Sequence, residues 1–389
     1  MMLATRLKEL KFSATIGVAD KVRELEACGE KIIQLSVGQP HVPTPIEFKQ
    51  GAISALMNDH VFYSHSRGIL ELRKLIIQRY NTLYGTLFDA EKNILITPGG
   101  KQAIYYFIMS VLNTGDEVII PTPSWVSYAE IVKMAGGMPV FVECPKDKNF
   151  EICFDLIEKA ITSRTKAIIL NSPNNPTGVM VKKEVLEAIN NLCVSRDIFL
   201  LSDEVYDQIV FDNQCNASIV SVNHTLKNCV MINSFSKMYS MSGWRIGYIL
   251  GAPEIIGAML KFQQNTVTCP TTFAQFGALE AIKHGDWFTT QLVEMYQENR
   301  NFLIAGLQKM RSFNFVCPEG TFYLFLDVSK ITTDSAAFCL DLLSRCKVAA
   351  VPGIAFGNNG EGFIRISFAT EKSNLVLFLQ RLNETYESC

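Results

Sequence analysis

The sequence predicts an α/β protein in which a large domain, with a mainly parallel and helix-covered sheet, is joined to a smaller α+β domain built from both termini. The chain has 389 residues, enough for about two to three domains. Hydrophobic residues make up 48% of it and charged residues 19%, which supplies material for sizeable cores. Short apolar runs alternate with helical stretches, a pattern typical of a parallel sheet covered on both faces.

The elements follow in order along the chain. Val22 and Leu25 share one face of a helix predicted over residues 19–28, and a loop rich in Pro and Gly follows up to Pro45. We expect residues 1–45 to form the N-terminal part of the small domain and its linker.

Five short runs rich in Ile, Val and Leu predict the strands of the large sheet. They are Asn93–Ile96, Glu117–Ile120, Ala167–Leu170, Ile198–Leu201 and Cys229–Ile232. Each run ends at a polar or turn-forming residue, and helical stretches separate the runs. The large domain is therefore predicted over residues 46–285.

The last third of the chain predicts the rest of the small domain, over residues 286–389. Helical patterns continue to about residue 310. Three apolar runs then predict the strands of a second, smaller sheet: Tyr323–Val328, Val348–Val351 and Phe363–Phe368.

Charge and composition argue against several classes of function. Lys and Arg number 36 against 38 acidic residues, a formal net charge of −2, which disfavours a nucleic-acid binder with a basic surface. No apolar run approaches the roughly 18 residues of a membrane span, and the start of the chain lacks the pattern of a secretory signal. The 11 cysteines show no metal-ligand spacing and fit a reducing compartment. We expect a cytoplasmic protein without a metal, a membrane or a nucleic acid as partner.

Functional side chains follow the predicted strands at the point where each strand ends. In open α/β sheets, ligands bind beyond the carboxyl ends of the strands. These ends deliver Gly99 and Gly100, Trp125, Asn175, Asp203 with Tyr206, and Lys237. Their gathering at one edge predicts a small-molecule site.

Each of these signals also has a structural alternative. The pair Gly99–Gly100 either opens a helix N-terminus to an anion such as phosphate or makes an ordinary turn. Asp203 is either a buried carboxylate that needs a cationic partner or the N-cap of a following helix. Lys237 is either solvated among hydroxyl neighbours or, with Arg245 and two serines, part of a phosphate cradle. Arg365, in an apolar run, either pairs with an anion or faces water at a sheet edge.

Three motifs occupy these positions in order: Asn175-Pro176-Thr177-Gly178, Asp203-Glu204-Val205-Tyr206, and Ser234-Phe235-Ser236-Lys237 with Arg245 eight positions on. Together they resemble the pyridoxal-phosphate-dependent aminotransferases of class I, the fold-type-I group, over nearly the whole chain. Four segments look most similar to the bacterial aspartate aminotransferases. They are Ser13-Ala14-Thr15, Gly99-Gly100-Lys101-Gln102-Ala103, Ser124-Trp125-Val126-Ser127-Tyr128 and Ser172-Pro173-Asn174-Asn175-Pro176-Thr177-Gly178.

The resemblance implies pyridoxal 5'-phosphate as the cofactor and assigns roles to residues. Lys237 would hold the cofactor as a Schiff base and move a proton on the substrate, and Asp203 would keep the pyridinium nitrogen protonated. Asn175 and Tyr206 would hydrogen-bond the phenolic oxygen, and Trp125 would stack on the ring. The phosphate would be held by Gly100, by the backbone of Lys101, and by Ser234, Ser236 and Arg245.

The resemblance also implies how the substrate binds. The residues around it would be Gly38, Trp125, Asn175, Arg365, Lys101, Ser13 and Thr15. Arg365 would bind the α-carboxylate in a fork geometry, and Lys101 with the two hydroxyls near the N-terminus would bind a distal carboxylate. Tyr63 would reach the phosphate of a neighbouring subunit, so the active unit would be a homodimer with shared sites.

We therefore expect transamination of an L-amino acid, first of all L-aspartate with 2-oxoglutarate giving oxaloacetate and L-glutamate, with wider acidic or aromatic substrates such as prephenate. Other enzymes with the same cofactor remain alternatives: a carbon–sulfur β-lyase, an aminocyclopropane-carboxylate-synthase-like enzyme, or an aromatic- or alanine-specific aminotransferase. A ligand-sensing regulator of this fold is disfavoured, because the sequence before residue 13 leaves no room for a DNA-binding module.

Overall fold

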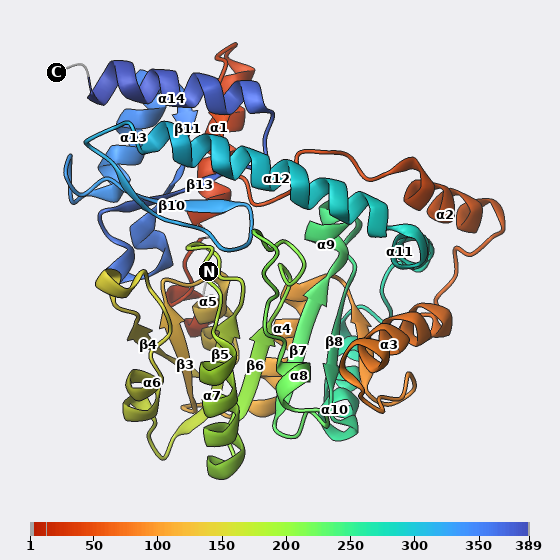
Figure 1. Cartoon of the computed structure of the whole chain (residues 1–389). Coiled ribbons are helices and arrows are strands. Elements are labelled where there is room, and N and C mark those ends of the chain that lie inside the picture. Colours follow the sequence, from red (N-terminus) through yellow and green to blue (C-terminus); the bar gives the residue numbers. More distant parts are fainter. Residues whose placement is uncertain (1–3, 13, 388–389) are drawn as a thin grey trace.

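The computed structural model describes residues 4–12 and 14–387. At its centre lies a seven-stranded sheet in the order β2-β8-β7-β6-β5-β3-β4 (Figure 1). The strands are β2 (Ile94–Thr97), β3 (Glu117–Thr122), β4 (Met138–Glu143), β5 (Thr165–Asn171), β6 (Phe199–Asp203), β7 (Cys229–Ser234) and β8 (Gly247–Gly251). Only β8 runs antiparallel to its neighbours, so the sheet is mainly parallel, as predicted.

All five predicted strands of the large sheet are present, and each ends one or two residues later than predicted. Two further strands were not predicted. β4 is an edge strand whose residues, except Val142, are exposed or half-buried, so it lacks the continuous apolar run of a central strand. β8 begins and ends with glycine, which weakens the strand pattern although all five residues are buried.

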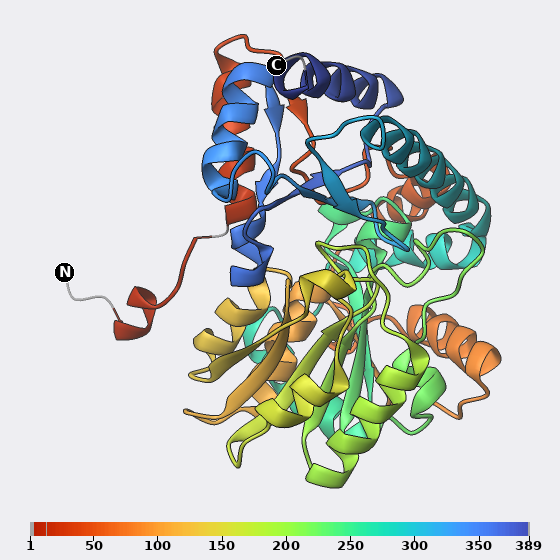
Figure 2. The same cartoon turned by 60° about the vertical axis from the view of Figure 1, so that its left-hand side comes forward.

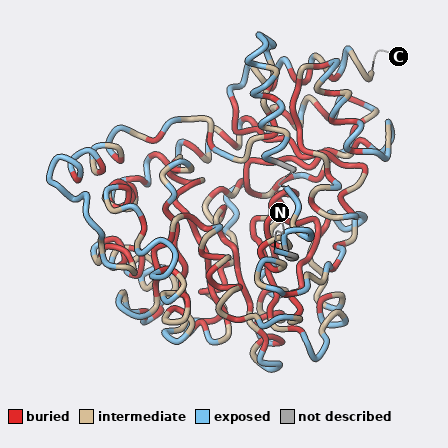
Figure 3. The backbone as a smooth tube through the Cα atoms, turned by 180° about the vertical axis from the view of Figure 1, so that it is seen from behind, coloured by how far each residue is buried: buried red, intermediate tan, exposed pale blue. Residues whose placement is uncertain are grey.

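Helices cover both faces of the large sheet because alternate residues of each strand point to opposite sides. Ile119 belongs to the hydrophobic core shared with α3 (Leu70–Tyr84) and α7 (Lys183–Arg196), whereas Val118 and Ile120 belong to the core shared with α4 (Gly100–Val111), α5 (Ser127–Met134) and α10 (Pro253–Thr266). Figure 3 shows these buried strands as a continuous region in the lower body of the molecule.

A second, smaller group of elements lies over the carboxyl ends of the large sheet's parallel strands (Figure 1). An antiparallel sheet has the order β12-β13-β10-β9, and a two-stranded parallel sheet pairs β1 with β11. The strands are β1 (Ile33–Gln34), β9 (Asn314–Val316), β10 (Tyr323–Asp327), β11 (Val348–Ala349), β12 (Val351–Pro352) and β13 (Phe363–Ser367). The helices around them are α1 (Ala14–Ala27), α12 (Asp286–Leu307), α13 (Ser335–Cys346) and α14 (Lys372–Tyr386).

The run Val348–Val351, predicted as one strand, is divided between two sheets. Its first part pairs with β1 from the N-terminal segment, and its last residue begins β12, which pairs with β13. The small α+β part thus contains segments from both ends of the chain, as expected for the fold class. The limits at residues 45 and 285 stay predictions.

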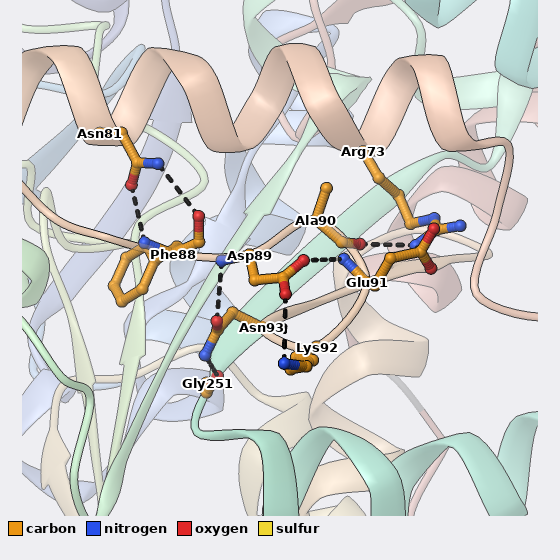
Figure 4. Close-up of polar contacts among 9 residues, drawn as sticks. All are labelled: Arg73, Asn81, Phe88, Asp89, Ala90, Glu91, Lys92, Asn93 and Gly251. Atoms are coloured by element: carbon orange, nitrogen blue, oxygen red, sulfur yellow. Dashed lines mark hydrogen bonds and ion pairs between the residues drawn. The ribbon is translucent and has the colours of Figure 1, made fainter.

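The connection between α3 and β2 is fixed by polar contacts (Figure 4). Asn81 accepts a hydrogen bond from the backbone N–H of Phe88 and donates one to its carbonyl, both at 3.0 Å. The buried Arg73 forms an ion pair of 2.9 Å with Glu91. These contacts set the start of β2, whose other end leads into the site.

Within the described residues, no helix is long and apolar enough to cross a membrane, and no cluster of His, Cys, Asp or Glu is arranged to hold a metal ion. The segment before α1 carries a short 3-10 helix, Thr5–Lys8, which stands away from the body in Figure 2.

Candidate active site

A cavity of about 390 Å³ lies where the parallel strands end beneath the small sheet. Twelve of the predicted site residues line it. From the start of α4, the end of β7 and the segment after it come Gly100, Lys101, Ser234, Ser236, Lys237 and Arg245. From other elements come Gly38, Trp125, Asn175, Asp203, Tyr206 and Arg365. The cavity has the size of an ordinary small-molecule site.

Three predicted site residues are not among those that line the cavity. Tyr63 is 83% exposed and lies outside it. Ser13 lies outside the described residues, and Thr15 is placed only as part of the backbone of α1. The next residue, Ile16, does line the cavity, so this end of α1 borders the site.

Asp203 ends β6 and is almost completely buried. Its carboxylate accepts a hydrogen bond of 2.6 Å from the Tyr128 hydroxyl and one of 3.3 Å from the backbone N–H of Val205. A turn follows rather than a helix, so Asp203 is not a helix N-cap. Burial raises the pKa of Asp203 to about 6, against the opposite effect of the Tyr128 hydrogen bond.

No lysine or arginine among the described residues forms an ion pair with Asp203. The nearest cationic influence in the described part of the chain is Lys237, whose charge lowers the pKa of Asp203 without a direct contact. A buried carboxylate that lines a cavity and forms no ion pair is suited to a ligand that brings a positive charge or a proton.

Lys237 lies in the short helix α9 (Phe235–Met238), directly after β7. Its side chain is half-buried, and its Nζ donates a hydrogen bond to the Gly38 carbonyl. Burial, and then the charges of Arg365 and Arg245, lower the pKa of the Lys237 ammonium to about 8. The side chain is not freely solvated, and its neutral amine is accessible near physiological pH.

The residues predicted to form a phosphate cradle lie together where α4 begins beside the end of β7. The Ser234 hydroxyl accepts from the Ser236 N–H at 3.0 Å and lies 2.7 Å from its hydroxyl. Gly100 begins α4, so the helix N-terminus opens on the same cavity. Arg245 donates to the carbonyls of Ser242 and Pro98 at 2.9 and 3.2 Å.

Both the backbone conformation and the position of Arg245 favour glycine at position 99. Its φ of +84° is a conformation that side chains rarely adopt, and a Cβ there would overlap the guanidinium of Arg245. Gly99 therefore permits the close approach of Arg245 to the start of α4, which an ordinary turn would not need.

Arg365 lies in β13, an interior strand of the small sheet, and is 2% exposed, so it is not a solvent-facing edge residue. Its guanidinium donates to the Asn175 side-chain oxygen at 3.0 Å and to the Ser36 carbonyl at 2.8 Å. Its Nε is buried without a partner among the described residues. An arginine with unused donors at a cavity is suited to bind a carboxylate.

The remaining cavity residues provide ring surfaces and hydrogen bonds. Trp125 is half-buried, with its ring edge-on to Tyr128 and the Lys101 Nζ 4.8 Å from its centroid. The Tyr206 hydroxyl lies 3.0 Å from the Tyr323 hydroxyl.

Sequence reasoning missed three side chains of the site. Tyr128 bonds Asp203, and Tyr323 bonds Tyr206. Asn171 accepts from the Asn175 N–H at 2.8 Å and donates to the Asp203 carbonyl at 2.9 Å, so it joins the ends of β5 and β6. Asn171 directly follows a predicted strand, and this position could have identified it as a site residue.

Comparisons with known proteins agree with this geometry. The profile of the family described as aminotransferase class I and II matches residues 30–382. The aspartate aminotransferase of Thermotoga maritima is 38% identical over 387 residues, with full coverage of both chains. The probable aspartate/prephenate aminotransferase of Aquifex aeolicus is 37% identical over 99% of this chain and 98% of its own.

Among solved structures, the aspartate aminotransferase of Thermus thermophilus with maleate superimposes with a TM-score of 0.94 at 36% identity, covering 99% of each chain. The chain belongs to the class I and II aminotransferase family. It is an aminotransferase, and the predicted fold class is confirmed.

Proposed function

We propose that the enzyme uses pyridoxal 5'-phosphate to transfer the amino group of L-aspartate to 2-oxoglutarate, giving oxaloacetate and L-glutamate, with wider acidic or aromatic substrates. One observation carries the proposal: a buried carboxylate that forms no ion pair among the described residues lines the same cavity as four cationic side chains. The carboxylate is Asp203, and the cations are Lys101, Lys237, Arg245 and Arg365.

This set of charges fits the cofactor. Asp203 would bind the protonated ring nitrogen, which supplies a cationic partner. Ser234, Ser236 and Arg245 would hold the phosphate together with the N-terminus of α4. When bound, the cofactor supplies a ring that accepts electrons from the substrate Cα.

Residues of the chain would hold the cofactor, transfer the proton and cover the ring. Lys237 would hold the cofactor and move the proton at the substrate Cα, because its lowered pKa makes the neutral amine accessible. Asn175 and Tyr206 would donate hydrogen bonds to the phenolic oxygen. Trp125 would cover the ring face and help to exclude water.

Arg365 would bind the α-carboxylate that every amino-acid substrate carries, exchanging its bonds to Asn175 and Ser36 for bonds to the substrate. Lys101 would bind a distal carboxylate, together with Ser13 and Thr15. The names of the relatives from Thermotoga and Aquifex support aspartate as a substrate and prephenate as a wider one. Maleate, bound in the Thermus structure, is itself a dicarboxylate.

We also propose a homodimer with shared sites, in which Tyr63 reaches the phosphate of the neighbouring subunit. An exposed apolar surface on α2 (Ile46–Met57) and the segment after it supports this assembly. Its residues are Ile53, Met57, Val61, Phe62 and Tyr63, between 45% and 83% exposed. A second copy of the chain would cover them.

The test is a panel of amino donors with 2-oxoglutarate and the purified enzyme. We expect L-aspartate to give the highest kcat/KM and oxaloacetate as product. Release of pyruvate and a thiol from a cysteine conjugate, without formation of glutamate, would instead assign the protein to the β-lyases.

A further inference from the structure

Tyr323, the first residue of β10, is almost completely buried and lines the same cavity. It contacts three of the predicted site residues: its hydroxyl meets Tyr206 and Gly38, and its ring meets Arg365. The ring of Tyr323 also packs in the hydrophobic core, against Phe322, and its backbone pairs with Ser367 of β13.

The hydroxyl contact has a defined direction if the proposed function holds. The two hydroxyl oxygens of Tyr206 and Tyr323 lie 3.0 Å apart, and each group has a single proton to donate. If the Tyr206 proton is used for the phenolic oxygen of the cofactor, only Tyr323 can donate between the two. Such a chain of donors polarises the second hydroxyl and makes it a stronger donor.

The ring contact concerns the carboxylate-binding side of the site. The guanidinium carbon of Arg365 lies 4.3 Å from the centroid of the Tyr323 ring. This cation–π geometry holds the plane of the guanidinium in place at a buried position.

The third contact, between Tyr323 and Gly38, affects the surroundings of Lys237. A Cβ on Gly38 would lie 2.5 Å from the Tyr323 hydroxyl oxygen. Glycine at position 38 therefore allows this loop to pack against the Tyr323 side chain. The carbonyl of Gly38 accepts the hydrogen bond of the Lys237 Nζ. Tyr323 therefore borders the loop that orients the lysine.

We propose that Tyr323 is a positioning residue that couples the two halves of the site. Its hydroxyl donates to Tyr206 and directs the Tyr206 proton to the phenolic oxygen, while its ring fixes Arg365 for the substrate carboxylate. This inference rests on the proposed function of the site.

The hydroxyl is tested by Tyr323→Phe in the holoenzyme, read by the pH titration of the visible absorption band. The group that titrates would be the nitrogen that joins Lys237 to the cofactor. Weaker donation from Tyr206 would leave more negative charge on the neighbouring phenolic oxygen, and this charge would stabilise the protonated form of that nitrogen. The midpoint of this pH titration should therefore rise by about half to one pH unit. A shift of this size corresponds to part of the free energy of one hydrogen bond. Tyr296→Phe is the matched control, because Tyr296 is equally buried but does not line the cavity.

A double-mutant cycle separates coupling from a structural effect. In a Tyr206→Phe background, Tyr323→Phe should move the midpoint no further, whereas a merely structural role would add its own shift. The ring is tested by the affinity of the holoenzyme for maleate. Tyr323→Phe should leave the Kd within about twofold, and Tyr323→Leu should weaken it about tenfold, the size of a desolvated cation–π contact.

An unchanged or lowered midpoint in Tyr323→Phe, while the wild-type enzyme forms the visible band, would overturn this inference and leave the proposed function standing. A wild-type protein that forms no visible band with the cofactor would overturn the proposed function and this inference with it. If Tyr323→Leu does not fold, the conservative variant and the cycle still decide.

Discussion

The hydroxyl of Tyr128 donates a hydrogen bond of 2.6 Å to the carboxylate of Asp203. Tyr128 lies on α5, one turn after Trp125, and both side chains are brought to the end of β6. The bond favours the charged form of a carboxylate that burial pushes toward the neutral form. Tyr128 thus helps to keep Asp203 ionised.

Tyr128→Phe should raise the pKa of Asp203 and weaken its hold on a positively charged ring. We expect the affinity for pyridoxal 5'-phosphate to fall about tenfold, the size of one hydrogen bond to a charged group. The acidic limb of kcat/KM should move to higher pH. The control is Tyr106→Phe, which loses a 2.7 Å contact to Thr266 away from the cavity. Equal losses in both variants would contradict the role of Tyr128.

Lys101→Ala should separate dicarboxylic from monocarboxylic substrates. Removal of the Lys101 charge should lower kcat/KM for aspartate by about tenfold to a hundredfold, the size of an interaction with one charged group. A monocarboxylic amino acid should lose far less, and comparison of the two donors by steady-state kinetics checks this. Equal losses for both would reject Lys101 as the distal-carboxylate group.

Arg365→Lys keeps the positive charge but loses the fork geometry and the flat contact with Tyr323. Every amino-acid substrate should therefore bind more weakly, with an apparent KM raised about tenfold or more. Arg345→Lys is the matched control, because Arg345 is exposed and also lies over a tyrosine ring, that of Tyr386. Unchanged KM values across the donor panel would argue against α-carboxylate binding by Arg365.

Glu204 should make the stability of the fold depend on pH. It is 1% exposed, accepts hydrogen bonds from Ser202 and Ile219, and burial raises its pKa to about 7. Because the folded state binds this proton more tightly than the unfolded chain, the free energy of unfolding falls as pH rises from about 4.5 to 7. The fall is at most about 3 kcal/mol.

Glu204→Gln should lack this part of the pH dependence, because the amide keeps an acceptor for the Ile219 N–H but does not ionise. Denaturant unfolding of both proteins at pH 5 and pH 8 gives the difference. A stability gap between wild type and variant that does not change with pH would contradict the assignment.

Much of the site could be predicted because the carboxyl ends of parallel strands meet at one edge of a sheet. Asp203 and Lys237 follow two neighbouring strands, β6 and β7, so their sequence positions sufficed to bring them together. Arg365 was found because a guanidinium in an apolar run needs an anionic or water partner.

Other features depend on contacts that no local pattern encodes. Tyr323 meets Tyr206, 117 residues away, only because the small sheet lies over the large one. The direction of β8 and the division of 348–351 between two sheets depend on which strands are free to pair. The proposed role of Tyr63 at a second subunit rests on the resemblance alone, because its exposed side chain does not line the cavity.

The most direct test of the proposed transamination is a half-reaction of the purified holoenzyme with L-aspartate, without any 2-oxo acid. We expect the visible band to be replaced by that of the amine form of the cofactor, with one oxaloacetate formed per site, and Lys237→Ala to show neither change. A visible band that aspartate leaves unchanged, or one that disappears without formation of oxaloacetate, would contradict it.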